Sequence, residues 1–258
     1  MDIAIELKAL ILGIVEGATE FLPVSSTGHL IVAADFLGFR GEIAKTFEIA
    51  IQLGAILAVV WNYHHRLAGV VKGLASEQGA RRFVANLAVA FLPAAVLGLV
   101  FSNWIKSTLF NPVSVAVAFI VGGLVIILIE KRATTPRVAT VDDITWREAL
   151  WVGVAQCFSL IPGTSRSGAT ISMALFLGHR REAAARFSFL LALPITLGAA
   201  LVKVPALLQS TADTGPVLAG MLAAAVAGFA AIRLLLAYVR VRDYKPFVYY
   251  RFAFALLV

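Results

Sequence analysis

Two short polar stretches hold the residue types that can do chemistry in this chain of 258 residues. In the first, Glu16 and Glu20 lie four residues apart, so they share one face of a helix. The polar residues that follow them are Ser25, Ser26, Thr27 and His29. Two neighbouring carboxylates can bind a divalent cation, or one of them can stay protonated and act as an acid or base.

The second stretch combines hydroxyl groups with one arginine. Its polar members are Thr164, Ser165, Arg166, Ser167 and Thr170. The planar guanidinium fork of Arg166 suits phosphate oxygens, and a helix beginning there presents free N–H groups and a positive dipole end. The hydroxyl groups alone also fit plain helix N-caps. We predict a site for an anionic, phosphate-bearing ligand, with Ser26 or His29 as nucleophile and Glu20 or His29 as base.

The residues around both stretches are strongly apolar. Hydrophobic residues make up 60% of the chain and charged residues 14%, whereas a soluble domain carries about 25% charged residues. Five apolar runs are long enough to span a bilayer as helices, namely 46–61, 83–101, 112–130, 187–208 and 216–238. A sixth run, 246–258, reaches only about 20 Å as a helix, so it either begins earlier or does not cross. We predict an all-α integral membrane protein with about six transmembrane helices in one domain, 1–258.

The two polar stretches lie inside segments that are copies of each other. A shift of 140 residues aligns 9–40 with 149–180 and matches eleven residue types without gaps. The matches in the first copy are Ala9, Leu10, Gly13, Ser25, Gly28, Ile31, Ala34, Phe36, Leu37, Gly38 and Arg40. The residues predicted to interrupt helix are Pro23, Gly28, Pro162, Gly163 and Gly168. We infer internal repeats of roughly 1–130 and 140–258.

The basic residues predict how the chain is threaded through the membrane. If each interrupted segment is a re-entrant helical hairpin, three full spans separate the two, so the hairpins enter from opposite faces, as in an inverted-topology repeat. Fourteen Lys and Arg lie in the segments 62–82, 131–147, 179–186 and 239–245, and four lie in 1–8, 39–45, 102–111 and 209–215. The positive-inside rule places the first set in the cytoplasm and both termini outside. No nucleic-acid partner is expected, because the net charge of +7 is spread over several loops.

Both stretches resemble the signature motifs of a known family, the bacterial undecaprenyl pyrophosphate phosphatases. The motifs are EGATEFLPVSSTGHL (16–30) and PGTSRSGAT (162–170), and the similarity extends to FEIAIQLGAILAVV (47–60) and KPFVYYR (245–251). The resemblance implies an enzyme that removes one phosphate from undecaprenyl diphosphate, recycles this lipid carrier for cell-wall synthesis and gives bacitracin resistance. It also implies an active site open to the outer face of the bacterial inner membrane, assistance by Mg2+ or Ca2+, and dimer formation. Bacitracin would compete for the substrate rather than bind the protein.

The resemblance also assigns roles by position. Glu16 and Glu20 match the acidic pair, as catalytic residues and metal ligands, and Ser26 matches the candidate nucleophile. The further matches are Thr27 and His29 in the first motif and the phosphate clamp Ser165, Arg166, Ser167 and Thr170 in the second. The residues alone leave a second class open, a secondary transporter or flippase of an anion or lipid phosphate, because transporters also use inverted repeats with broken helices.

Overall fold

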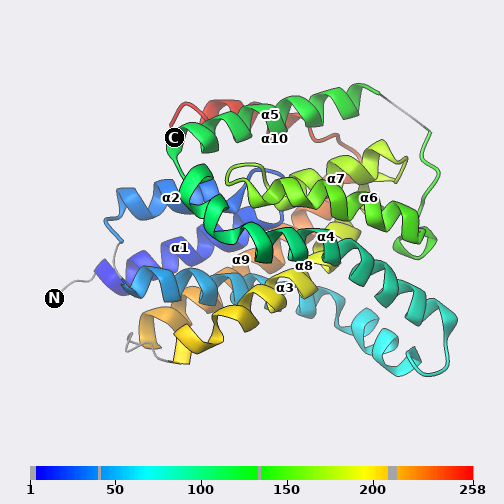
Figure 1. The fold of residues 1–258 in the computed structure, drawn as a ribbon, viewed down its shortest axis with the longest axis horizontal. Helices are drawn as coiled ribbons and strands as arrows, with labels where there is room; N and C mark the ends of the chain where they lie inside the picture. Colours follow the sequence, from blue (N-terminus) through cyan, green and yellow to red (C-terminus); the bar gives the residue numbers. More distant parts are fainter. Residues whose placement is uncertain (1–3, 40–41, 133–134, 209–213, 258) are drawn as a thin grey trace.

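The computed structural model describes residues 4–39, 42–132, 135–208 and 214–257, which form an elongated bundle of helices (Figure 1). These ranges contain ten α-helices, two short 3-10 helices and no strand beyond a single bridge between Val138 and His179. The predicted all-α fold is confirmed. Helices satisfy every backbone hydrogen bond within one segment, which a chain surrounded by lipid requires.

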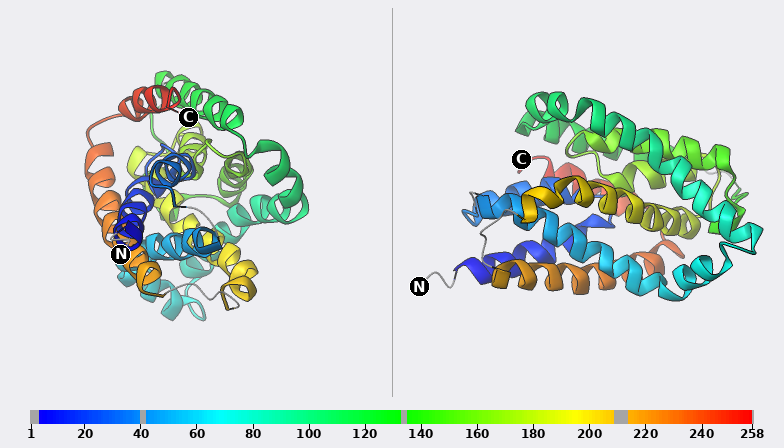
Figure 2. Two further views of the ribbon diagram at one scale, coloured as in Figure 1. Left: turned by 90° about the vertical axis from the view of Figure 1, so that its left-hand side faces the viewer. Right: turned by 60° about the horizontal axis from the view of Figure 1, so that its bottom comes forward.

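The helices follow one another with short connections. In chain order the α-helices are α1 (Ala4–Glu20), α2 (Ser26–Phe36), α3 (Glu42–Gly73), α4 (Gln78–Leu109), α5 (Pro112–Lys131), α6 (Trp146–Gln156), α7 (Arg166–Phe176), α8 (Arg181–Leu208), α9 (Thr214–Val239) and α10 (Lys245–Phe254). The 3-10 helices are η1 (Val141–Asp143) and η2 (Cys157–Leu160). Figure 2 shows α9 beside α1, and α10 beside α5 at the edge of the bundle.

Four of the described helices, α4, α5, α8 and α9, are long and apolar enough to cross a membrane. They cover four of the five predicted full spans. The fifth, 46–61, lies within α3, which carries Glu48 and Gln52 among its apolar residues. The final helix, α10, has ten residues and reaches about 15 Å at ~1.5 Å per residue. It is too short to cross, which answers the question left open for 246–258.

Each interrupted segment contains two helices that pack on each other, α1 with α2 and α6 with α7. Helices α2 and α7 are both 11 residues long. The prediction that Gly28 and Gly168 interrupt helix is wrong, because both lie inside the second helix of their pair. The breaks come earlier, around Pro23 and Gly163. Gly28 serves close packing instead, since a Cβ there would overlap the ring of Phe119.

Glycines bring the first helix of each pair against a long neighbouring helix. A Cβ at Gly13 of α1 would overlap the carbonyl of Gly220 in α9, and a Cβ at Gly153 of α6 would overlap the backbone of Ala90 in α4. Small residues are typical of such crossings in membranes, where close packing rather than hydrophobic driving force holds helices together. These two contacts fix the helices that lead into the polar turns.

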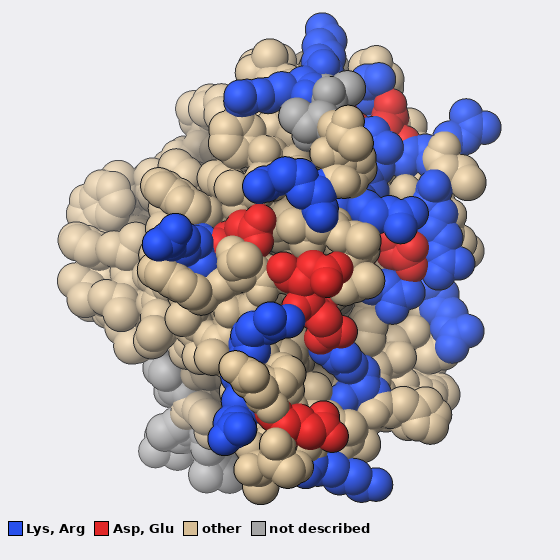
Figure 3. Space-filling view, turned by 90° about the vertical axis from the view of Figure 1, so that its right-hand side faces the viewer, with Lys and Arg blue, Asp and Glu red and all other residues tan. Residues whose placement is uncertain are grey.

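The four basic segments that were predicted to share one side lie together at one end of the bundle. Figure 3 views that end and shows Lys and Arg spread over it. Ion pairs connect the segments, namely Arg66 with Asp142 and Arg240 with Glu182, and Arg181 pairs with Glu130 near the end of α5. Helix α1 begins and α10 ends at the opposite end (Figure 1). The larger set of basic residues predicted from the sequence therefore lies at the end away from the start of α1 and the end of α10.

Candidate functional site

A strained serine stands at the turn of each helix pair. Ser25 has φ of 69° and Ser165 has φ of 74°, and among the described residues they are the only non-glycine positions with positive φ. Such a conformation costs about 1–3 kcal/mol and persists only where the surrounding structure fixes it. The two serines are the N-caps of α2 and α7. The strain therefore lies immediately before Ser26 and Arg166.

The carboxylate of Glu20 joins these two residues. Its Oε2 accepts a hydrogen bond of 2.5 Å from the hydroxyl of Ser26, and its Oε1 accepts one of 3.2 Å from Nη2 of Arg166. The side chain of Arg166 is 10% exposed and that of Glu20 is 17% exposed. A hydroxyl, a base within hydrogen-bond reach and a group that orients the base form the arrangement of an activated nucleophile. The link spans both helix pairs, because Arg166 comes from the second pair.

Helix α8 supports Arg166 from the other side. Nη1 of Arg166 donates to the carbonyl of Ser188 at 2.8 Å, and the Ser188 hydroxyl lies 2.7 Å from that of Thr170. A guanidinium has five N–H donors. Within the described ranges Arg166 uses two of them, so the remaining donors can serve a phosphate group.

The other hydroxyl groups of the second stretch bind the protein itself. Ser165 accepts from the backbone N–H of Gly168 at 3.1 Å, which is the N-cap interaction of α7. Ser167 donates to the carbonyl of Leu22 in the first turn at 2.7 Å. Ser165, Ser167 and Thr170 are buried, whereas Thr27 is exposed on α2. The structure thus places Ser165 and Ser167 at the junction of the two turns.

The imidazole of His29 lies apart from the Ser26–Glu20–Arg166 link. Its Nδ1 is 2.7 Å from the carbonyl of Ser25, so Nδ1 donates, and its Nε2 lies 2.6 Å from the hydroxyl of Tyr250 and accepts. The ring stacks on Phe254 at a centroid distance of 4.0 Å, and His29 is 6% exposed. Both ring nitrogens are therefore occupied by neighbours other than Ser26.

Glu16 is a buried carboxylate one turn before Glu20. It has no exposed surface, and neither of its oxygens has a hydrogen-bond partner among the described residues. Glu20, Glu48 and Arg166 lie close enough to act on it electrostatically. A buried charge without a partner is costly, so a cation or a proton at Glu16 fits this site. Hard divalent cations prefer such oxygen ligands.

No group of three or more His, Cys, Asp and Glu side chains in the described ranges is arranged to hold a metal ion. A cation at Glu16 and Glu20 would therefore need further oxygen ligands from a bound phosphate or from water.

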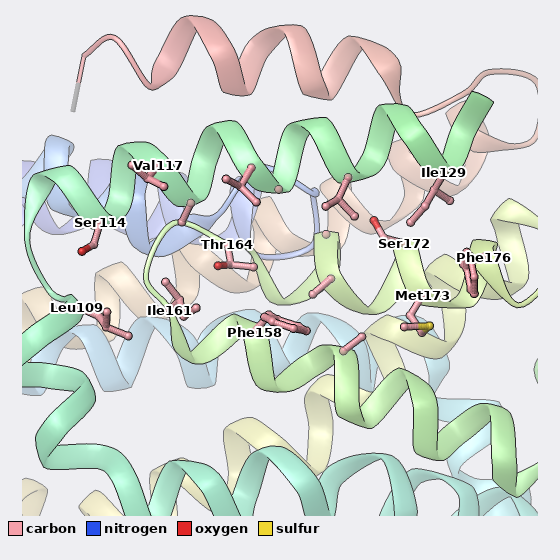
Figure 4. Close-up of a pocket in the computed structure, with 17 residues that line it drawn as sticks. Leu109, Ser114, Val117, Ile129, Phe158, Ile161, Thr164, Ser172, Met173 and Phe176 are labelled. Atoms are coloured by element: carbon pink, nitrogen blue, oxygen red, sulfur yellow. The ribbon is translucent and has the colours of Figure 1, made fainter. Parts of the chain in front are cut away.

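An apolar cavity of about 540 Å³ lies between α5, α6 and α7. Figure 4 shows Phe158, Thr164, Met173 and Phe176 among the residues around it. The cavity extends from Leu109 and Ser114 at one end to Ile129 and Phe176 at the other, and Thr164, close in sequence to Arg166, lies between these ends. Its apolar lining suits a hydrocarbon chain rather than a polar ligand.

Two neighbouring residues of α10 were missed in the sequence analysis, Tyr250 and Arg251. Tyr250 binds His29, and Arg251 has no exposed surface at all. A single basic residue inside the apolar run 246–258 was the available signal, because a charge at membrane depth has a functional partner as a rule.

The chain matches the family model described as bacitracin resistance protein BacA over residues 9–257. Several curated relatives are similar over the whole chain. An undecaprenyl-diphosphatase of Cupriavidus metallidurans is 50% identical over 281 residues, covering 100% of this chain and 96% of the relative. Those of Janthinobacterium sp. (strain Marseille) and Dechloromonas aromatica are 53% and 52% identical, each covering 100% of this chain and 95% of the relative.

Proposed function

This chain belongs to the bacitracin resistance protein BacA family, and from that premise we propose that Ser26, Glu20 and Arg166 form the active site of an undecaprenyl-diphosphatase. The protein is a multi-pass membrane enzyme that hydrolyses undecaprenyl diphosphate to undecaprenyl phosphate and inorganic phosphate. This reaction recycles the lipid carrier for cell-wall synthesis and gives bacitracin resistance. The observation that carries the proposed site is the hydrogen-bonded link from Ser26 through Glu20 to Arg166.

The proposed reaction has two steps. The Ser26 hydroxyl attacks the terminal phosphorus, its proton passes to Glu20, and the bond from that phosphorus to the bridging oxygen breaks to release undecaprenyl phosphate. Glu20 passes this proton to the departing undecaprenyl phosphate and is free to accept another. Water then attacks the phosphoserine and gives a proton to Glu20, and the bond from phosphorus to the Ser26 oxygen breaks to free inorganic phosphate while Glu20 returns the proton to that oxygen. Arg166 stabilises the charge on the transferring phosphoryl group, which is the main task in this class of reaction.

The geometry favours Ser26 over His29 as the nucleophile. The Ser26 hydroxyl already donates a hydrogen bond to the Glu20 carboxylate, which can accept its proton. Both nitrogens of His29 are engaged by Ser25 and Tyr250, and its ring is stacked on Phe254. His29 therefore serves to hold the first turn and α10 together.

The acidic pair is the proposed place for a divalent cation, Mg2+ or Ca2+. Glu16 supports this proposal because it is buried and lacks a hydrogen-bond partner among the described residues. When bound, the ion would offset negative charge on the diphosphate. Glu16 and Glu20 would supply the carboxylate ligands. Thr27, exposed beside Ser26, and the hydroxyls of the second turn complete the polar surroundings of the phosphate.

The remaining proposals concern the substrate and the membrane. Part of the prenyl chain occupies the apolar cavity beside Thr164, which supports entry of the substrate from the lipid. The basic end faces the cytoplasm of the bacterial inner membrane, and the site opens to the outer face. The two pairs, α1–α2 and α6–α7, are re-entrant hairpins. The resemblance of the two motifs also supports a homodimer, and supports bacitracin acting by sequestering the substrate.

We expect the purified protein in detergent to release inorganic phosphate and undecaprenyl phosphate in equal amounts from undecaprenyl diphosphate. Phosphate is measured colorimetrically and the lipid product by mass spectrometry. The matched control is Glu20→Gln, which keeps the size of the side chain but loses the base. Movement of the lipid across a vesicle membrane without phosphate release would instead identify a transporter.

The proposed orientation predicts which ends of the molecule are accessible in intact cells. In a Cys157→Ser background, a cysteine replacing the exposed Ser107 near the end of α4 should react with an impermeant thiol reagent. A cysteine replacing the exposed Ser76, at the basic end, should react only after the membrane is permeabilised. Labelling of the Ser76 site alone in intact cells would contradict the proposed orientation.

A further inference from the structure

One buried guanidinium connects the two polar turns. Arg251 has a large charged side chain that is fully buried. A guanidinium has five N–H donors, and Arg251 finds five backbone carbonyls. Nε donates to Phe119, Nη1 to Pro23 and Thr164, and Nη2 to Ala118 and Gly163, at distances of 3.0, 3.1, 3.0, 2.9 and 3.1 Å respectively.

The acceptors belong to three separate parts of the chain. Pro23 lies in the first turn, two residues before the strained Ser25, and Thr164 lies in the second turn, directly before the strained Ser165. The remaining carbonyls on Nε and Nη2 include two of α5, which anchor the guanidinium against that helix. One side chain thus holds both strained turns at fixed positions against a membrane-spanning helix.

Arg251 contacts the turns that carry Ser26 and Arg166, but it is not itself part of the Ser26–Glu20–Arg166 link. Each strained serine is followed at once by a residue of the link, Ser26 in the first turn and Arg166 in the second. The five carbonyls leave Arg251 no donor for a phosphate oxygen, and it is not exposed to the site. Moving either turn would change the distance between Ser26 and Arg166, and with it the alignment of Glu20.

We propose that Arg251 is a positioning residue of the phosphatase. By binding the carbonyls of both turns, it sets the distance between Ser26 and Arg166. This inference rests on the proposed function. All five of its acceptors are neutral carbonyls, so the role depends on the shape of the guanidinium fork rather than on pairing with a carboxylate.

The first test is Arg251→Lys, with kcat and KM measured for phosphate release from undecaprenyl diphosphate. Lysine keeps the charge, but its ammonium has three donors and cannot reach five carbonyls. Because a misplacement of about 1 Å can cost about a hundredfold in rate, we expect kcat to fall by about tenfold or more while KM stays within about threefold. The matched control is Arg233→Lys, at an exposed arginine of α9, which should keep the wild-type kcat.

The second test disturbs the same contacts without removing the arginine. A Cβ at Gly122 of α5 would overlap Nη2 of Arg251, and alanine is a good helix former. Gly122→Ala should therefore give the same fall in kcat with little change in KM.

Three results would overturn the proposal. The first is a wild-type kcat in both folded variants, even with a lower melting temperature, since Arg251 would then serve stability alone. The second is a rise in KM at unchanged kcat, which would make Arg251 a source of binding charge. The third is failure of both variants to fold. Absence of phosphate release by the wild-type protein would instead refute the proposed function.

Discussion

Replacing Ser26 with alanine is expected to lower the rate of phosphate release by about a thousandfold or more, the scale of removing a nucleophile that acts together with its base. The hydroxyl that forms the new bond to phosphorus is lost, while Glu20 and Arg166 stay bonded to each other. The measurement is phosphate release under single-turnover conditions, which separates the chemical step from product release. Ser107→Ala is the matched control, because it removes an exposed serine hydroxyl of α4 outside the site.

The same prediction can be checked by trapping the covalent intermediate. Substrate labelled in its terminal phosphate should leave an acid-stable label that peptide mapping assigns to Ser26. An acid-labile label on His29 would show that the histidine attacks and that the Ser26–Glu20 bond has another purpose. Wild-type turnover by Ser26→Ala would remove the serine from the mechanism altogether.

Changing Arg166 to lysine is expected to lower phosphate release by at least about a hundredfold, the scale of removing one preorganised donor from a transition state. Lysine keeps the positive charge but lacks the planar fork with which Arg166 hydrogen-bonds to both Glu20 and the Ser188 carbonyl and still has donors left for a phosphate. Comparing kcat with KM shows where the loss falls. A fall in both kcat and kcat/KM identifies stabilisation of the transition state.

The exposed variant Arg233→Lys also serves as the control for Arg166→Lys, since it tests the substitution outside the site. Near-normal phosphate release by Arg166→Lys, with normal protein yield, would exclude the proposed clamp. A rise in KM alone would mean that Arg166 binds the ground state and the transition state equally.

The sequence predicted the parts of this site that depend on local pattern. The spacing of Glu16 and Glu20, the polar turns and the apolar runs indicated a membrane protein with two broken helices. The sequence concentrates Lys and Arg in four segments, and Figure 3 shows Lys and Arg gathered on one end of the bundle. Such features follow from helix periodicity and from the cost of charge in lipid.

Other features depend on contacts between distant residues, and the sequence could not provide them. The roles of Gly28 and Gly168 were mistaken because a glycine that breaks a helix and one that allows close packing look alike in a sequence. The choice between Ser26 and His29 required the position of Tyr250, which is 221 residues from His29. A lone arginine in an apolar run could be noticed, but the role of Arg251 could not be predicted, because its acceptors are backbone carbonyls, which leave no pattern of side-chain types.

The place of α10 in the chain bears on how the protein is made. Ribosomes deliver a chain from its N-terminal end, so all five carbonyls that Arg251 binds are synthesised and inserted before their guanidinium arrives. Until then both strained turns lack this restraint, so the positions of Ser26 and Arg166 relative to each other are not yet fixed by it. We therefore expect the proposed active site to form late in biogenesis, when α10, a helix too short to cross the membrane, reaches its place.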